Sequence, residues 1–303
     1  MSASRAAELP RGTLRLWVVA ARPRTLPAAV APVLVGTALA GSEDVFRPLA
    51  FVAALIGSVF IQIGTNLSND YSDARRGADT EDRLGPVRVT AGGLMPPRTV
   101  LGGTYVAFGI AVAAGAYLAA VAGWELLVVG AASILAGVLY TGGPRPYGYE
   151  GLGELFVFLF FGLVAVAGSY YVQTEDLRWE AVALGVPVGL LAAAILVVNN
   201  VRDIDTDRRA GKRSLAVKLG RALARRLYAA MLVLAFVAPA VIWLSGGLSA
   251  WVLLSLAALP LAPPLVGTVG TRTDGPALNG ALAGTGRLLA VFSLLLAAGV
   301  LLS

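Results

Sequence analysis

Long apolar segments alternate with short polar ones along the whole chain, which is the pattern of a protein that crosses a membrane repeatedly. Each apolar segment is close to the roughly 20 residues that a helix needs to span a bilayer core. Strands of a membrane β-barrel are shorter and alternate apolar with polar residues, so helices are expected. Prolines within the first, sixth and eighth segments predict kinks. The segments are approximately 22–41, 47–69, 98–120, 123–141, 152–174, 180–200, 222–245, 248–270 and 281–301.

The predicted fold class is therefore all-α: a polytopic transmembrane helical bundle of about nine spans, forming a single domain over residues 1–303. The composition agrees, because 57% of the residues are hydrophobic and 14% are charged. The chain has no cysteine and no histidine. This excludes disulfides, thiol nucleophiles, histidine-based triads and the usual zinc sites. Any chemistry must use carboxylates, amides, tyrosines and basic residues, with a bound hard metal ion.

The positive charges predict the orientation in the membrane. Nearly all of the 24 Lys and Arg residues fall in alternate loops, whereas the other loops hold only Arg47 and Arg178, and Arg287 lies within the last apolar segment. Cytoplasmic loops are the ones enriched in Lys and Arg. We therefore expect a multi-pass cell-membrane protein with its N-terminus inside and its first apolar segment retained as a span. The net charge of +6 follows from this bias and does not require a nucleic-acid partner.

A polar stretch that gathers acidic and basic residues follows the second apolar segment. Residues 66–88 read NLSNDYSDARRGADTEDRLGPVR. Asn66, Asp70 and Asp73 are three or four positions apart, so on a helix they share one face. Asp79 and Asp82 follow in the loop. Because carboxylates bind hard divalent cations and arginines bind phosphate, the stretch predicts a diphosphate held through magnesium, with an apolar tail in the membrane.

The same combination recurs after the sixth apolar segment. Residues 199–220 read NNVRDIDTDRRAGKRSLAVKLG, in which Asn199, Asp203 and Asp207 fall at intervals of four on one helix face. Polar side chains at membrane depth are costly and usually functional. The two stretches, 66–82 and 199–207, occupy corresponding positions and predict two pseudo-repeated halves. One metal and substrate site would lie between the halves, on the cytoplasmic side.

A third polar segment, residues 140–153, reads YTGGPRPYGYEGLG and is too rich in glycine and proline to be helical. The predicted topology places it on the same side as the two acidic stretches. Tyr140 and Tyr147 are therefore candidates to line the site, although tyrosines are also common at membrane interfaces. Glu154, just inside the next apolar segment, fits an ordinary acidic residue at a helix N-terminus.

Together these segments resemble the UbiA superfamily of membrane prenyltransferases, and in detail the branch that prenylates 1,4-dihydroxy-2-naphthoate in menaquinone synthesis. The resemblance covers nearly the whole chain. One departure is Ser214, where the family pattern leads us to expect threonine; the hydroxyl is kept. The motifs that carry it are the stretches 66–93 and 199–220, ARPRTLP at 21–27, YTGGPRPY at 140–147, GLGE at 151–154 and TGR at 285–287.

The resemblance implies a bundle of nine helices around a central cavity, with the acidic motifs facing each other across magnesium-bound diphosphate and a lateral opening for the isoprenoid tail. The implied cofactor is Mg²⁺, and the implied substrates are a long all-trans polyprenyl diphosphate and 1,4-dihydroxy-2-naphthoate. The residues assigned to catalysis are Asp70, Asp73, Asp203 and Asp207, which together with Asp79 are also the metal ligands. Those assigned to substrate binding are Asn66, Arg88, Tyr140, Tyr147, Asn199, Arg202 and Lys212.

Three other interpretations stay open at this point. Another aromatic acceptor, such as 4-hydroxybenzoate, would use the same kind of site. The CDP-alcohol phosphotransferases also carry acidic clusters in membranes, but their D-G-x-x-A-R and G-x-x-x-D-x-x-x-D spacing is not found in this chain. A transporter would place a cation site near the middle of the bilayer on broken helices, whereas both acidic stretches here follow apolar segments at one side.

Overall fold

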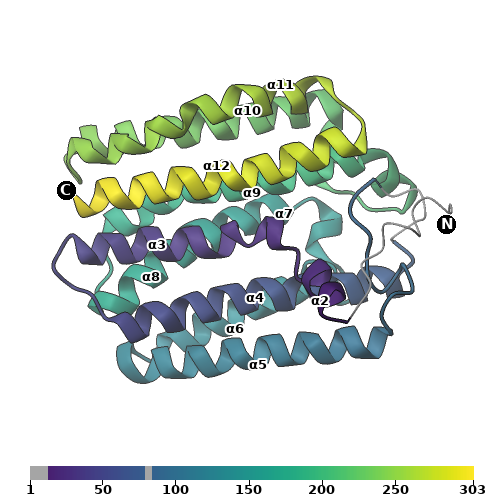
Figure 1. The fold of residues 1–303 in the computed structure, drawn as a ribbon, viewed down its shortest axis with the longest axis horizontal. Helices are drawn as coiled ribbons and strands as arrows, with labels where there is room; N and C mark the ends of the chain where they lie inside the picture. The colour runs from purple at the N-terminus through teal and green to yellow at the C-terminus, as the bar shows by residue number, and fades with distance from the viewer. Residues whose placement is uncertain (1–12, 79–83) are drawn as a thin grey trace.

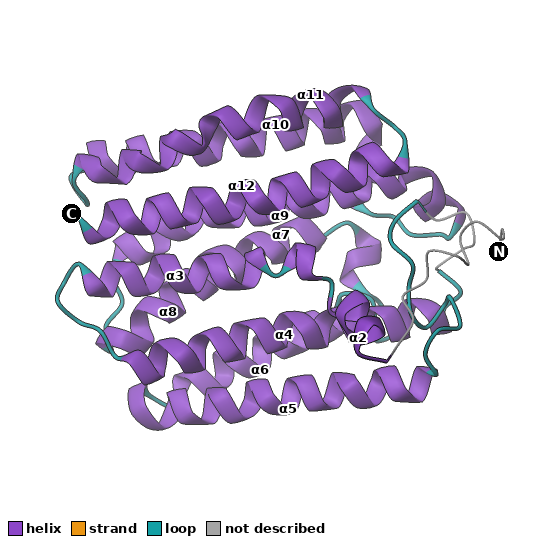
Figure 2. Cartoon of the chain, viewed as in Figure 1, coloured by secondary structure: helices purple, strands orange, loops and turns teal. Residues whose placement is uncertain are grey.

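The computed structural model describes residues 13–78 and 84–303, and these residues form helices and loops without a strand (Figures 1 and 2). The predicted all-α fold class is confirmed. Asp79 and Asp82 lie outside the described residues. The α-helices are α2 (Thr13–Ala21), α3 (Pro27–Gly41), α4 (Pro48–Arg75), α5 (Pro97–Ala122), α6 (Glu125–Leu139), α7 (Gly153–Val157), α8 (Ala165–Thr174), α9 (Trp179–Arg209), α10 (Leu215–Leu244), α11 (Ala262–Thr271) and α12 (Gly275–Leu301).

Four shorter pieces connect these helices. Two are 3₁₀ turns in loops on the motif side, Pro23–Thr25 before α3 and Tyr147–Glu150 before α7. A π-helical stretch, Phe158–Val164, joins α7 to α8 into one continuous segment. A longer 3₁₀ stretch, Ala250–Leu261, precedes α11. The last two lie within predicted spans, so those spans are irregular rather than straight α-helices.

The number of membrane spans differs from the expected nine. Within the described residues, seven helical segments are long and apolar enough to cross a bilayer. The segment Thr13–Thr25 and α3 meet at an angle of 54°, and there are up to eight spans if this bent pair counts as one. α6 has only 15 residues, or about 22 Å at 1.5 Å per residue, against a hydrocarbon core of about 30 Å. The count of nine is therefore not confirmed.

Two long helices carry the acidic motifs to the same end of the bundle. α4 and α9 run in the same direction, and the motifs occupy their last turns, at the right of Figure 1. The loop 140–153 and the loop after α9 lie at that end as well. The common placement predicted for the three polar stretches is thus confirmed within the described residues.

α9 is the most deeply buried of the long apolar helices, with 72% of its apolar window inside the protein. Glycines let the π-helical stretch approach it closely: a Cβ added to Gly162 would lie 2.5 Å from the Cα of Gly189. Small residues at such contacts allow helix backbones to pack in a membrane, where van der Waals packing supplies the attraction. The close contact gives the motif at the end of α9 a rigid support.

Candidate active site

A cavity of about 500 Å³ runs through the bundle and joins the two acidic motifs to an apolar interior. Its polar end is lined by Asp73 of α4, by Asp203 and Asp207 of α9, and by Lys212 from the loop after α9. Its remaining walls come mainly from apolar and aromatic side chains of α4, α5, α6, α8 and the π-helical stretch. The cavity therefore offers charge at one end and a hydrocarbon-like surface along its length.

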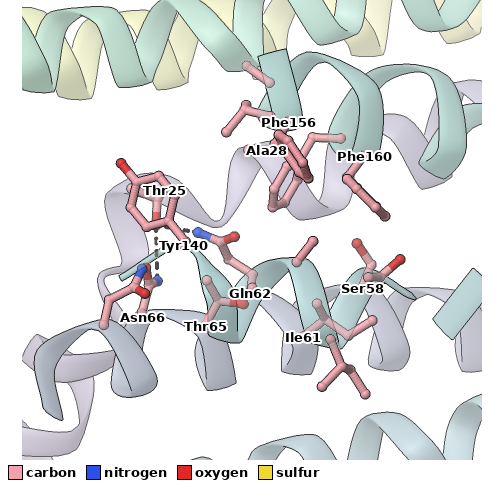
Figure 3. Close-up of a pocket in the computed structure, with 18 of the residues that line it drawn as sticks. Thr25, Ala28, Ser58, Ile61, Gln62, Thr65, Asn66, Tyr140, Phe156 and Phe160 are labelled. Atoms are coloured by element: carbon pink, nitrogen blue, oxygen red, sulfur yellow. Dashed lines mark hydrogen bonds between the residues drawn. The ribbon is translucent and has the colours of Figure 1, made fainter. Parts of the chain in front are cut away.

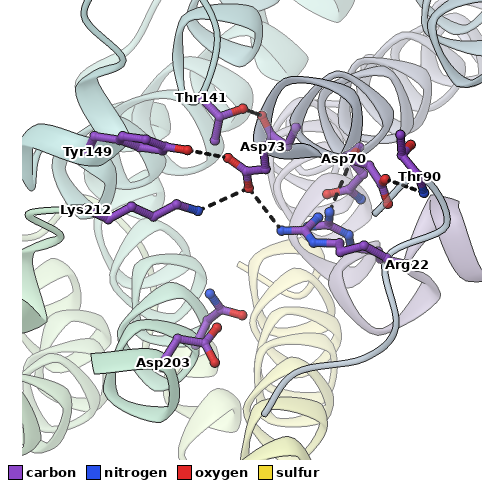
Figure 4. Close-up of polar contacts among 12 residues, drawn as sticks. Arg22, Asp70, Asp73, Thr90, Thr141, Tyr149, Asp203 and Lys212 are labelled. Atoms are coloured by element: carbon purple, nitrogen blue, oxygen red, sulfur yellow. Dashed lines mark hydrogen bonds and ion pairs between the residues drawn. The ribbon is translucent and has the colours of Figure 1, made fainter. Parts of the chain in front are cut away.

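Asp73 is the centre of the polar end, and it is 1% exposed. The phenol of Tyr149 donates to its Oδ1 at 2.7 Å. Lys212 Nζ lies 3.2 Å from its Oδ2, and Arg88 Nη2 donates to the same oxygen at 3.4 Å. These partners come from three different loops, as Figure 4 shows for the two labelled ones. One carboxylate thus gathers two cationic side chains and a hydroxyl at the cavity end.

Local backbone geometry holds these groups in position. α4 ends at Arg75, and Gly77 follows with φ +65°, a left-handed conformation that glycine adopts at little cost after a helix. After α9, the amide of Lys212 donates to the carbonyl of Asp207 at 2.9 Å. The next amide, that of Arg213, donates to the carbonyl of Tyr149 at 2.9 Å. The last bond ties the loop after α9 to the loop that carries Tyr149, so Tyr149 and Lys212, two of the three partners of Asp73, are positioned together.

Asp70 takes a position different from the one expected. It is 2% exposed and does not line the cavity. Its two carboxylate oxygens accept hydrogen bonds from the backbone amides of Val89, at 3.1 Å, and Thr90, at 2.9 Å. Asp70 therefore fixes the loop that carries Arg88. Its predicted role as a metal ligand stays a prediction.

Arg202 is held by protein side chains, and its expected contact with substrate stays a prediction. Arg202 is 2% exposed. Its guanidinium donates two hydrogen bonds to Asp203, from Nε to Oδ1 at 2.8 Å and from Nη2 to Oδ2 at 2.5 Å. It donates further to Oδ1 of Asn199 and to Oδ1 of Asn279 of α12, both at 2.7 Å. Arg202 is absent from the cavity wall, whereas Asp203 and Asn199 are part of it. Its position makes it an organiser of α9 and α12.

Amide side chains line the cavity wall along α4 (Figure 3). Asn66 Nδ2 donates to the carbonyl of Ala21 at 2.9 Å and to the hydroxyl of Thr25 at 3.3 Å. Gln62, one turn earlier, donates to the same hydroxyl at 3.1 Å. These bonds attach the bend before α3 to α4. Asn66 therefore lies at the cavity, as predicted, and uses its amide N–H groups to hold the wall.

Aromatic rings lead from the polar end into the apolar part. Tyr140 and Tyr147 both line the cavity, with ring centroids 5.5 Å apart in an edge-on arrangement. Tyr147 stacks on Phe156 at 4.0 Å, and Phe160 follows at 6.1 Å from Phe156. Burial raises the pKa of Tyr147 well above its ordinary value, so its phenol stays protonated. Both tyrosines therefore line the cavity, and their role in substrate binding stays a prediction.

Several residues of the cavity or the site were not assigned a role from the sequence. Tyr149 stands in the same glycine-rich loop as Tyr140 and Tyr147, but nothing in the sequence distinguishes it as the partner of Asp73. Gln62 precedes Asn66 by four positions, which is a signal that helical periodicity provides. Asn279 lies 77 positions from its partner Arg202, and it belongs to no motif. Arg22, which also lines the cavity, falls within the ARPRTLP segment.

The donor set fits magnesium carried with a phosphate ligand. Among residues 13–78 and 84–303, no group of three or more acidic side chains is close enough to hold a metal ion alone. Mg²⁺ usually binds through one or two carboxylates together with substrate phosphates and water, so a complete protein cage is not required. Asp73, Asp203 and Asp207 all line the cavity and carry hard carboxylate oxygens of that kind.

The fold and site define a polytopic membrane protein whose cavity is charged at one end and apolar along its length. The model of the UbiA prenyltransferase family matches residues 29–277, so the chain belongs to that family. It is 43% identical over 281 residues to a 1,4-dihydroxy-2-naphthoate octaprenyltransferase of Mycobacterium tuberculosis, covering 93% of this chain and 95% of that protein. It is 39% identical over 293 residues to the protein of the same name from Escherichia coli, covering 95% of each chain.

Solved structures of low sequence identity share the fold. A UbiA homologue from Archaeoglobus fulgidus, bound to GPP and Mg²⁺, superposes with a TM-score of 0.66 at 15% identity, over 93% of this chain and 99% of that one. A UbiA homologue from Aeropyrum pernix K1 gives a TM-score of 0.68 at 18% identity, over 91% and 97% of the two chains. The helical arrangement described above is therefore that of the family.

Proposed function

We propose that this protein transfers an all-trans polyprenyl group from its diphosphate to 1,4-dihydroxy-2-naphthoate, in a magnesium-dependent reaction of menaquinone biosynthesis. The products are a demethylmenaquinol, carbon dioxide and diphosphate. Relatives up to 43% identical over most of the chain carry the name of this activity. The observation that supports it best is the single cavity that joins Asp73 and Lys212 to the ring of Phe160. A polyprenyl diphosphate has the same division into an anionic head and an apolar tail.

Cationic groups at the polar end bind the diphosphate in this proposal. Lys212 and Arg88 both reach Oδ2 of Asp73, so they are already held at the place where the head group enters. Charge-assisted hydrogen bonds from such groups are among the stronger ones in proteins. The hydroxyl of Tyr149 adds a neutral donor at the same carboxylate. These three groups stabilise negative charge as it builds up on the departing oxygens.

Asp73, Asp203 and Asp207 are the proposed ligands for magnesium, which when bound neutralises diphosphate charge and makes it a better leaving group. Arg202 donates one hydrogen bond to each oxygen of Asp203, and a carboxylate oxygen can accept more than one bond. In this proposal Arg202 orients Asp203 toward the cavity. Asp70 keeps the loop of Arg88 in place, which gives this residue an indirect part in the reaction.

The chemical step needs no strong base. The C–O bond of the allylic donor breaks and its electron pair goes to diphosphate, while the electron-rich naphthoate ring forms the new C–C bond. The carboxylate of the acceptor leaves as carbon dioxide, and its bonding electrons return to the ring. The apolar cavity keeps water away from the allylic carbon. The lack of histidine in the chain is consistent with this chemistry.

The proposed site faces the cytoplasm, and the proposed domain is the whole chain, built as two pseudo-repeated halves. Support for the orientation comes from the basic residues that flank the motifs, because cytoplasmic loops are enriched in Lys and Arg. Support for the halves comes from α4 and α9, which run in the same direction and both carry an acidic motif in their last turns.

The proposal is tested with purified protein, Mg²⁺ and an eight-unit polyprenyl diphosphate, with 1,4-dihydroxy-2-naphthoate and 4-hydroxybenzoate as separate acceptors. Mass spectrometry of the lipid extract identifies the products. The expected result is a prenylated product lacking the carboxyl group with the naphthoate, and little or no product with 4-hydroxybenzoate. Product formation with 4-hydroxybenzoate but not with the naphthoate would show that the proposed acceptor is wrong.

A further inference from the structure

Two segments that carry the family resemblance, ARPRTLP at 21–27 and TGR at 285–287, meet on the outside of the bundle. A Cβ added to Gly286 of α12 would lie 2.9 Å from the carbonyl oxygen of Arg24. Glycine at this position therefore lets α12 approach the turn before α3. Because Arg287 directly follows Gly286, the contact brings Arg24 and Arg287 to neighbouring positions on the surface.

The two arginines have no part in the cavity. Both are exposed, and neither lines the cavity wall. Within residues 13–78 and 84–303, neither side chain forms a hydrogen bond or an ion pair. Neighbouring guanidinium groups repel each other, and an anion placed between them would stabilise both.

The surroundings of the arginines face lipid. Helix positions seven apart share one face, and the face of Arg287 continues on α12 with Leu294 and Leu301, each of which is 55% exposed. On the other side, α2 exposes Leu14 and Val18, which are four positions apart. Exposed leucine and valine side chains on a membrane bundle contact acyl chains. The arginines therefore stand beside hydrocarbon rather than in a fully aqueous loop.

The depth of the arginines follows from the helix lengths. α3 and α12 lie side by side and run in the same direction (Figure 1). Their far ends meet where a Cβ added to Gly41 would lie 2.8 Å from a methyl of Leu301. Arg287 precedes Leu301 by 14 positions, which is about 21 Å of helix, against a hydrocarbon core of about 30 Å. Arg287 thus lies near the inner edge of the hydrocarbon, where an unpaired charge is costly.

We propose that Arg24 and Arg287 bind the phosphate group of an anionic phospholipid, whose acyl chains lie along Leu294 and Leu301. The guanidinium fork matches the oxygens of a phosphate, and a long arginine side chain can extend from the hydrocarbon edge to the headgroups. A soluble phosphate offers the same anion, but the apolar face on α12 favours a lipid. This site is separate from the proposed prenyl transfer and does not depend on it.

A lipid bound at this place would also support the cavity wall from outside. Thr25, which follows Arg24, accepts hydrogen bonds from the side chains of Gln62 and Asn66. The turn that carries Arg24 is therefore held from the cavity side by α4. The proposed lipid would hold the same turn from the membrane side, together with α12.

The test uses delipidated protein in detergent, titrated separately with phosphatidylglycerol, phosphatidylcholine and inorganic phosphate. Thermal stabilisation at each concentration gives an apparent Kd. The variants are the double substitution Arg24→Gln/Arg287→Gln and each single substitution. The matched control is Arg98→Gln/Arg226→Gln, which removes the same charge from exposed positions on α5 and α10, at opposite edges of the bundle in Figure 1.

Wild type should bind phosphatidylglycerol more tightly than phosphatidylcholine. The double variant should raise the apparent Kd for phosphatidylglycerol about tenfold or more, a change of about 1.4 kcal/mol, and the control should keep the wild-type value. No preference in wild type, or an equal rise in the control, would overturn the site. Stabilisation by inorganic phosphate equal to that by phosphatidylglycerol would overturn the lipid as the ligand. If the double variant does not fold, the single variants decide by the same comparison with the control.

Discussion

The phenol of Tyr149 donates a 2.7 Å hydrogen bond to Oδ1 of Asp73, from a residue 76 positions further along the chain. The bond joins the loop before α7 to the end of α4. It is also the contact that brings the glycine-rich loop onto the charged end of the cavity, since the backbone of Tyr149 is bonded in turn to the loop after α9. Three polar segments far apart in sequence therefore meet at one carboxylate.

Replacement of Tyr149 by Phe should reduce turnover about ten- to a hundredfold, because a hydrogen bond to a charged group contributes about 1.5–3 kcal/mol. The ring and its packing are kept, so folding should be unaffected. Tyr105→Phe is the control, since Tyr105 is 68% exposed on α5. Steady-state kinetics measure both variants. Equal turnover of Tyr149→Phe and wild type would show that the bond has no part in the reaction.

Lys212→Ala and Arg88→Ala should each raise the KM for the donor about tenfold or more, because each removes a cationic group beside Asp73. Arg226 lies in the first half of α10, which follows the loop of Lys212, but it is exposed and does not line the cavity. Arg226→Ala should therefore leave the KM for the donor unchanged. Donor-dependent kinetics measure all three. A similar small effect in every variant would mean that these charges only orient the protein in the membrane.

Arg202→Lys should lower both thermal stability and turnover. An ammonium cannot reproduce the forked contact with Asp203 or reach Asn199 and Asn279 at the same time. Removal of one partner from a buried ion pair costs about 3–5 kcal/mol, which sets the scale of the effect. Arg221→Lys is the control, because its partner Asp205 is largely exposed and surface pairs contribute about 0–1 kcal/mol. Thermal unfolding in detergent and kinetics are the measurements.

The lack of cysteine allows a direct test of orientation with single introduced cysteines. Ala210 directly follows α9 and Ser245 directly follows α10, so the 30 residues of α10 lie between them. In intact cells a membrane-impermeant maleimide should label Ser245→Cys and Ser303→Cys, and should label Ala210→Cys only after the membrane is opened. Labelling of Ala210→Cys in intact cells would reverse the proposed orientation.

Helical periodicity was sufficient to predict which faces of α4 and α9 are polar, because each motif lies within one helix. Asn66, Asp73, Asn199, Asp203 and Asp207 all line the cavity on this basis. Asp70 falls on the same face by spacing, yet its oxygens are taken by amides of a loop about 20 residues further on. No local pattern encodes that contact, so spacing alone could not separate Asp70 from Asp73.

Long-range partners also explain why the surroundings of Arg202 could not be predicted from its motif. Its position in a motif suggested a phosphate ligand, whereas Asn279 of α12 and Asn199 help to hold it within the protein. The span count of nine stays unconfirmed for a different reason. Hydropathy treats 123–141 as a full span, but Gly123, with φ +129°, lies between α5 and α6, and the turn at Tyr140 limits α6 to 15 residues.

Proline positions did indicate where a helical segment is interrupted. Pro260, Pro263 and Pro264 predicted a break in the eighth segment, since proline lacks the N–H of a helical hydrogen bond. The structure has a 3₁₀ stretch that contains Pro260 and gives way to α11 at Ala262. Near the start of the described residues, Arg22 adopts φ +55° next to Pro23. The segment Thr13–Thr25 then meets α3, which begins at Pro27, at an angle of 54°.

The central claim is that prenyl transfer takes place at the charged end of the cavity, with magnesium held at Asp73. Its most direct test is product formation from an eight-unit polyprenyl diphosphate and 1,4-dihydroxy-2-naphthoate by wild type, Asp73→Asn and the surface control Asp205→Asn, each with Mg²⁺ and with EDTA. Wild type and Asp205→Asn should form product with Mg²⁺ and none with EDTA, and Asp73→Asn should form none in either condition. Wild-type turnover by Asp73→Asn, or undiminished product in EDTA, would contradict the account.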